Sequence, residues 1–157
     1  MTPASASALS IDPATADDRA DIADLCSVAG LPAGDLPADE LTSFRVLRRE
    51  ETGVCGVVAV ELFGPVGLLR SLAVHPDVRG RGLGQSLVLD AEAYARAQGG
   101  RAMYLLTHDQ AGFFRRLGYS AINRDAVPPV IAETPVFQET GDDAVCMWKQ
   151  LGASGFA

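Results

Sequence analysis

Three glycines and two arginines stand close together in one short stretch that could bind phosphate, Arg79-Gly80-Arg81-Gly82-Leu83-Gly84. Glycine lets the backbone turn sharply and approach a ligand closely. The stretch opens a helical pattern, and the amides of a first helical turn, here including Gln85, have no acceptor inside the helix and favour an anion. Arginine side chains add charges that phosphate oxygens accept. The alternative is a glycine-rich loop with solvated arginines.

Two other nucleotide-binding turns do not match this stretch. A P-loop needs Gly-x-x-x-x-Gly-Lys-Ser/Thr, a run that is absent from the sequence. A Rossmann turn needs a third glycine after Gly-x-Gly, and the required position is not glycine.

The surrounding periodicity predicts one α/β domain over residues 1–157, with frayed ends at about 1–8 and 152–157. Apolar and alternating runs predict strands at 9–11, 44–49, 54–63, 66–74, 102–106, 119–123 and 144–149. The pattern predicts helices at 16–29, at about 82–98, and from 109 or 110 to 117. In the second of these helices Glu92 lies outside the apolar stripe, so its side chain is expected to point outward. Residues 31–41 read as a loop, and Pro128-Pro129 opens a short turn or helix.

Two segments resemble the Gcn5-related N-acetyltransferase (GNAT) superfamily. The first is the strand ending Leu72-Ala73-Val74-His75-Pro76 followed by the Arg-x-x-Gly-x-Gly turn. The second is Ala111-Gly112-Phe113-Phe114-Arg115-Arg116-Leu117-Gly118-Tyr119. The resemblance implies a mixed, mostly antiparallel sheet of about six or seven strands flanked by helices, with a splayed parallel strand pair holding the cofactor.

That resemblance also implies a cofactor and its binding residues. The cofactor would be acetyl-coenzyme A (acetyl-CoA), with its pyrophosphate in the glycine turn. Backbone N–H groups of Leu72, Ala73 and Val74 would face the thioester carbonyl, and the helix carrying Phe113 would flank the pantetheine arm. Homodimers are frequent in this superfamily.

Acetyl transfer to an amine needs a group that accepts the amine's proton. Glu61 is a candidate that could act through water, and the alternative is a solvent-facing or strand-end charge. His108 follows a predicted buried strand and is a second candidate base or substrate contact. Many GNAT proteins carry a tyrosine where this chain has Phe114, which cannot donate a proton, so the thiolate would leave to solvent.

Arg70 lies in an otherwise apolar strand, where a charge needs a partner. It could clamp a substrate carboxylate, or it could pair with a carboxylate such as Glu61. Ser71 and Thr107 could add hydrogen bonds to the substrate.

Composition narrows the possible partners. The formal net charge of -7 argues against general binding to nucleic acid or an anionic membrane. No apolar run reaches membrane-spanning length, and we expect a cytoplasmic protein. Cys26, Cys55 and Cys146 show no zinc spacing, so we expect reduced packing residues and no metal, with a converging thiol site for a metalloid as the alternative.

The two motifs and their order predict an N-acetyltransferase, and the resemblance implies a small amino acid or amino-acid analogue as its substrate. Residues 128–137 and 144–147 resemble the arsenic-resistance-associated GNAT proteins, relatives of acetyltransferases for phosphinothricin and arsinothricin, which are glutamate-like compounds. Three alternatives stay open: a primary-metabolism glutamate acetyltransferase, a protein or peptide N-terminal acetyltransferase, and a non-catalytic acyl-CoA sensor.

Overall fold

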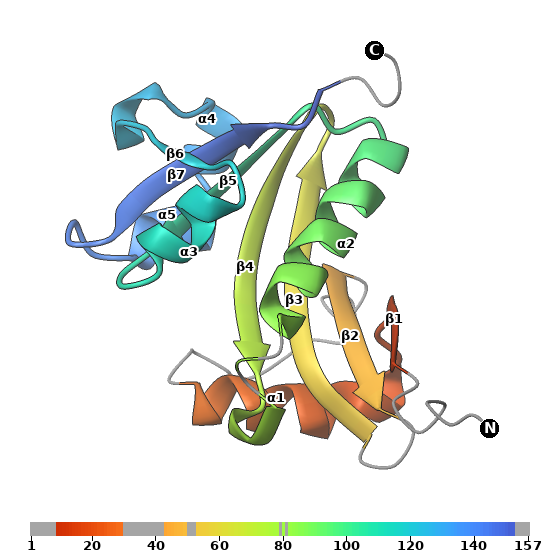
Figure 1. Cartoon of the computed structure of the whole chain (residues 1–157). Helices are drawn as coiled ribbons and strands as arrows, with labels where there is room; N and C mark the ends of the chain where they lie inside the picture. The colour runs from red at the N-terminus through yellow and green to blue at the C-terminus, as the bar shows by residue number, and fades with distance from the viewer. Residues whose placement is uncertain (1–8, 30–42, 50–52, 79, 81, 153–157) are drawn as a thin grey trace. The chain divides into compact units, whose positions relative to one another are not determined.

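The computed structural model describes residues 9–29, 43–49, 53–78, 80 and 82–152, and Figure 1 labels its helices and strands. Seven strands form one sheet in the order β1-β2-β3-β4-β5-β7-β6, which confirms the predicted mixed, mostly antiparallel sheet. The elements follow one another as β1 (Leu9–Pro13), α1 (Arg19–Val28), β2 (Phe44–Arg49), β3 (Gly53–Phe63), β4 (Val66–Val74), α2 (Leu83–Ala97), β5 (Ala102–Thr107), α3 (Ala111–Arg116), β6 (Ser120–Ala121), α4 (Pro129–Ala132), α5 (Pro135–Glu139) and β7 (Val145–Gln150).

The chain divides into two compact units. The first comprises Met1–Val60 and Ser71–Ala91, and the second comprises Glu61–Arg70 and Glu92–Ala157. The boundaries fall inside β3, β4 and α2. The single domain over residues 1–157 stays a prediction.

The sheet of the first unit is an antiparallel meander at its start. β1 pairs with β2 from Leu9 opposite Arg49 to Pro13 opposite Arg45. β2 pairs antiparallel with β3, and the register shifts between Leu47 and Arg48.

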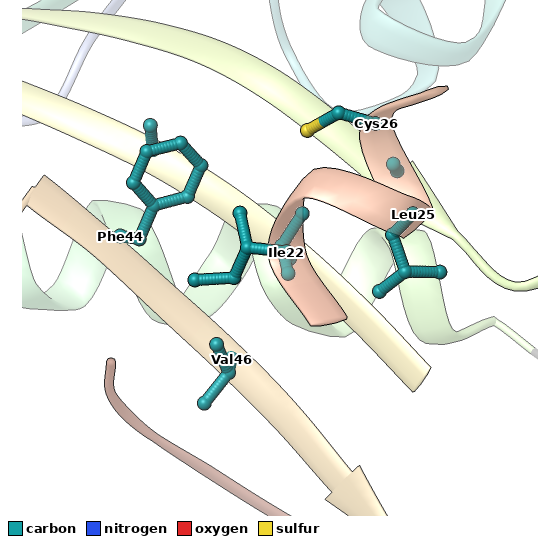
Figure 2. Packing of buried hydrophobic residues seen from close by; sticks show 8 residues of the cluster. Ile22, Leu25, Cys26, Phe44 and Val46 are labelled. Carbon is teal, nitrogen blue, oxygen red and sulfur yellow. The ribbon is translucent and has the colours of Figure 1, made fainter. Parts of the chain in front are cut away.

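Helix α1 covers one face of these strands. Its apolar residues Ile22, Leu25 and Cys26 recur at helical spacing and are buried. Figure 2 shows Ile22 facing Phe44 and Val46 of β2. Burying such side chains is the main stabilising contribution, about 1.5–3 kcal/mol for each large one.

The first half of α2 covers the opposite face. Successive strand residues point to opposite faces, so Leu47 faces away from α1 while Val46 faces it. A Cβ on Gly56 would lie 2.9 Å from Leu87 Cδ1 and 3.5 Å from Leu47 Cβ. Glycine at this position therefore lets α2 pack closely against β3.

The second unit is built around β5 and β7. β5 pairs antiparallel with β7 along its whole length, from Ala102 opposite Gln150 to Thr107 opposite Val145, and β6 adds a short pair beyond β7 (Figure 1). One buried cluster joins the strands to α4 and α5, with members Leu68, Tyr104, Val127, Ile131, Phe137 and Cys146.

Two predicted elements differ from the structure in detail. The predicted helix 16–29 begins as a short 3-10 helix (Ala16–Asp18), followed by α1. The predicted strand 119–123 shortens to β6, because Asn123 caps a 3-10 helix, Arg124–Ala126, by accepting from the Asp125 N–H. The predicted loop 31–41 lies wholly outside the described residues.

The sequence analysis missed α5. Thr134 caps this helix by accepting a hydrogen bond from the Phe137 N–H, and Pro135 occupies its first turn. Arg124 Nη2 donates to the carbonyls of Phe137 and Thr140 at 2.9 and 3.0 Å, which satisfies the end of the helix. A Thr-Pro pair is a helix-start signal, and it could have revealed this helix.

Candidate functional site

The turn before α2 is shaped for close approach of an anion. β4 ends at Val74, and a 3-10 helix (Pro76–Val78) leads to the turn. Gly80 and Gly82 have φ of +83° and +76°, and a Cβ on either would meet no atom within 4 Å. Glycine adopts this left-handed conformation at little cost, and the open space above both residues leaves the backbone accessible.

Helix α2 begins directly after this turn. The Ser86 N–H donates to the Gly82 carbonyl at 3.1 Å. The N–H groups of Leu83, Gly84 and Gln85 therefore lie in the first turn, where a helix offers them no acceptor. These groups and the positive end of the helix dipole fit a phosphate group. Arg79 and Arg81, also predicted to bind phosphate, lie outside the described residues.

Strand β4 departs from regular geometry just before residues 72–74. Its parallel pairing with β5 starts at Val66 opposite Ala102 and ends at Leu68 opposite Tyr104, although β4 continues to Val74. Ser71 has φ +58°, the one left-handed non-glycine residue in the described part of the chain. Such a conformation inside a strand costs about 1–3 kcal/mol and is concentrated at functional sites.

Glu61 and Arg70 meet in the second unit. Arg70 Nη2 lies 2.8 Å and Arg70 Nε 3.3 Å from Glu61 Oε2. The side chains are 15% and 26% exposed for Arg70 and Glu61. The structure therefore brings together the predicted clamp and the predicted base, in the ion pair that the sequence analysis left open as an alternative.

Thr107 and His108 end β5 and lead into α3. The buried Thr107 Oγ1 accepts a hydrogen bond from the Gln110 N–H at 3.0 Å, so its side chain shapes the chain toward α3. His108 is exposed, and its Nδ1 lies 3.5 Å from Asp143 Oδ2 in the loop before β7. An Nδ1 facing a carboxylate leaves Nε2 as the nitrogen that could exchange a proton with a substrate.

The aromatic residues of α3 pack together. Phe114 is buried, and its ring meets Phe113 and Tyr119 edge-on, with centroids 5.0 and 5.5 Å apart. Burial raises the pKa of Tyr119 far above its usual value, and the neighbouring Glu92 raises it further. Tyr119 is therefore a packing residue that holds its proton.

Tyr104 behaves in the same way. It lies in β5 and stacks on Trp148 of β7 with ring centroids 6.1 Å apart. Burial raises its pKa, and Cys146 adds to the shift. Both tyrosines fit the packing role expected of aromatic residues in a sheet.

The prediction that Glu92 points outward was wrong. Its side chain is 1% exposed and accepts hydrogen bonds from the Tyr119 hydroxyl at 2.8 Å and Lys149 Nζ at 2.9 Å. Lys149 Nζ also donates to the Leu117 carbonyl at 2.8 Å, beyond the end of α3. A charge that is buried this deeply is compensated by a partner, and here the partner comes from β7.

The cysteines lie inside the protein as expected. Cys26, Cys55 and Cys146 are free and buried. Burial raises the pKa of the Cys55 and Cys146 thiols. Within the described ranges no group of three His, Cys, Asp or Glu side chains could hold a metal ion. None of the described helices is long and apolar enough to cross a membrane.

The glycine turn lies within a segment that matches a known protein family. The family model of the acetyltransferase (GNAT) domain matches residues 41–121, more than half of the chain and including the turn and α3. The chain belongs to the GNAT acetyltransferase family. The predicted resemblance to GNAT proteins is thereby confirmed.

Amino-acid acetyltransferases are among the curated relatives of this GNAT domain. It is 32% identical over 100 residues to the amino-acid acetyltransferase of Ectopseudomonas mendocina, covering 63% of this chain and 23% of that protein. It is 46% identical over 52 residues to N-alpha-acetyltransferase 80 of Mus musculus, covering 33% of this chain and 17% of that protein. The matches span less than a quarter of either relative.

A solved structure shares the fold of this GNAT domain. N-acetylglutamate synthase from Neisseria gonorrhoeae, complexed with coenzyme A and N-acetyl-glutamate, matches with a TM-score of 0.82 at 20% identity. The match covers 92% of this chain and 35% of that chain. The likeness confirms the GNAT fold predicted from the sequence.

Proposed function

We propose that this GNAT domain transfers an acetyl group from acetyl-CoA to the amine of a small amino acid or amino-acid analogue. The observation that carries the proposal is the turn at Gly80 and Gly82, with left-handed backbone and open space before the first turn of α2. Family membership and the amino-acid acetyltransferase relatives support it.

The residues present fit coenzyme A. The turn, including Arg79 and Arg81, would hold the pyrophosphate with Leu83, Gly84 and Gln85 of α2. Leu72, Ala73 and Val74 would place backbone groups beside the thioester, and Phe113 would contact the pantetheine arm. When bound, the thioester supplies an acetyl carbon that an amine can attack.

Side chains of β3, β4 and β5, and of the residue that follows β5, are suited to the amine substrate. Arg70 would bind a substrate carboxylate, helped by hydrogen bonds from Ser71 and Thr107. Glu61 or His108 would take the proton from the amine, because only a neutral amine has a lone pair to donate. Phe114 offers no acidic hydrogen, so the leaving thiolate would be protonated by water.

Thiol release from acetyl-CoA tests the proposal. The amines would be glutamate, arginine, phosphinothricin, arsinothricin and short peptides. Turnover confined to free amino acids or their analogues supports it. Turnover of phosphinothricin and arsinothricin would favour an activity like that of the arsenic-resistance-associated GNAT proteins. Turnover of peptides alone would favour an N-terminal acetyltransferase, in line with the segment shared with the mouse relative. Coenzyme A binding without turnover of any amine would favour a sensor.

Two variants separate the candidate bases. Glu61→Gln and His108→Gln each remove one proton acceptor while keeping a similar size. Loss of the general base should lower kcat about 100-fold or more. The variant that lowers kcat with little change in the acetyl-CoA KM identifies the base, and equal small effects would exclude both residues.

A further inference from the structure

We propose that Arg70 holds Glu61 back until the carboxylate of an amino-acid substrate replaces it, so that the substrate itself releases the base. This inference rests on the function proposed above. Both observed contacts of the pair go to one oxygen, with Arg70 Nη2 and Nε at 2.8 and 3.3 Å from Glu61 Oε2. Two guanidinium donors therefore occupy the lone pairs of Oε2, so this oxygen cannot take a proton from an amine while the pair persists.

The pair is accessible enough for exchange. Arg70 and Glu61 are 15% and 26% exposed, so solvent reaches both side chains. A guanidinium presents several donors in a planar fork and binds one carboxylate much as it binds another. An incoming carboxylate that takes the place of Glu61 keeps the guanidinium paired throughout, which avoids the cost of an unpaired buried charge.

The charges of an amino acid match this exchange. The substrate carboxylate would compensate Arg70, and the substrate ammonium would compensate the released Glu61. One ion pair becomes two, and no charge is left without a partner. An amine without a carboxylate offers no group that could replace Glu61 on Arg70, so Glu61 would stay bound to the guanidinium.

The released carboxylate then completes the proton balance. The substrate ammonium gives one proton to Glu61, which leaves a neutral amine. The amine lone pair forms the C–N bond with the acetyl carbon, the C–S bond breaks, and the thiolate leaves with that electron pair. The second amine proton passes to water, so the products are the acetylated amino acid, the free thiol and one proton.

The first experiment compares an amino acid with its amide. L-glutamate is the first amino acid tested, and its diamide keeps the carbon skeleton without either carboxylate. If another amino acid turns over faster, it and its amide replace this pair. We expect kcat for the amide to be about 100-fold lower, because the base is not released. The ammonium group of the amide is more acidic than that of the amino acid. This difference alone would make kcat for the amide the higher of the two. Equal kcat values would overturn the proposal.

Arg70→Ala and Arg70→Gln provide the opposite test. Either change should raise the amino-acid KM about 10- to 100-fold through loss of charged hydrogen bonds. It should also raise kcat for the amide about 10-fold or more, because nothing then holds Glu61. A purely structural Arg70 would slow both substrates, and that result would contradict the proposal.

A matched control exists in the first unit. Arg45 Nε pairs with Asp90 Oδ2, and these side chains are 15% and 25% exposed, almost the same as Arg70 and Glu61. Arg45→Ala should leave the ratio of amino-acid to amide kcat unchanged. A change in that ratio as large as that of Arg70→Ala would show that loss of any such pair produces the effect.

A binding measurement tests the release of Glu61 from Arg70 even when no amine is acetylated. The ¹³C signal of the Glu61 carboxyl carbon, assigned by its loss in Glu61→Gln, reports whether Glu61 leaves Arg70. The amino acid should shift this signal, and the amide should not. No shift with any of the twenty free amino acids would overturn the inference. Absence of thiol release with every amine, beside a clear shift, would instead count against the proposed catalysis.

Discussion

The Tyr119 hydroxyl donates a 2.8 Å hydrogen bond to Glu92 Oε2, a carboxylate oxygen inside the second unit. Lys149, the one lysine in the sequence, binds the other oxygen of the same carboxylate at 2.9 Å. Three elements therefore meet at Glu92: helix α2, the segment after α3, and strand β7. This network fixes the end of α3, the helix that carries Phe113.

Glu92→Gln should destabilise the protein by about 2 kcal/mol. The amide fits the space and can still accept from Tyr119, but it leaves the Lys149 charge without its counter-charge. Urea unfolding measures the change. Glu133→Gln, an exposed position beyond α4, is the control and should stay within about 0.5 kcal/mol of the wild type. Equal stability of the two variants would show that the Glu92 network contributes nothing.

Asp18 should make the protein sensitive to acid. Arg48 donates two hydrogen bonds of 2.7 Å to this buried carboxylate and lowers its pKa below the usual value. The folded-state pKa is depressed, so this stabilisation is present above the unfolded pKa of about 3.9 and is lost as pH falls through the folded value.

The Asp18→Asn variant tests this linkage. It should be about 1.5–2 kcal/mol less stable than the wild type at pH 6. The difference should shrink as the pH falls below about 3.9, which unfolding curves at several pH values would show. A difference that is independent of pH would mean that the charge of Asp18 is not what stabilises the fold.

Gly82→Asp should weaken coenzyme A binding about 100-fold, because a carboxylate would face the phosphate groups. Gly64→Asp is a matched control: its φ is +68° and a Cβ there also meets no atom within 4 Å. Both changes carry a similar backbone cost, so only the position differs. Calorimetric titration with coenzyme A measures the affinity of each variant. Similar affinities for the two variants would show that the glycine turn does not bind the phosphate groups.

Ser71 should tolerate glycine better than a β-branched residue. Its φ of +58° is easy for glycine and strained for valine. We expect Ser71→Val to be about 2 kcal/mol less stable than Ser71→Gly in chemical denaturation. Equal stability of the two variants would contradict the left-handed conformation in β4.

Most of the fold could be predicted because strands and helices have different periods. The alternation in residues 44–49 and the helical spacing of Leu83, Leu87 and Ala91 are local patterns that need no knowledge of partners. The glycine turn could also be predicted from the sequence. Glycine permits a positive φ, and Gly80 and Gly82 both adopt one. The helix α5 was missed although Thr134-Pro135 is a local signal.

The errors at charged residues have another cause. A helical pattern assigns Glu92 to the side away from the apolar stripe, and its partner Lys149 is 57 residues later in the chain. The pattern cannot show that another element covers that side. The same applies to Asp18, which reads as a favourable charge in a first turn but is buried against Arg48 of β2.

The sequence by itself determined the family and the glycine turn at Gly80 and Gly82, because both depend on residue types within a few positions of each other. Only the tertiary structure decided that Glu61 and Arg70 form an ion pair and that Glu92 lies inside. Those outcomes depend on how strands align and on which element covers a side chain. Local backbone preferences do not encode such long-range packing, whereas the energy of a buried charge depends on it directly.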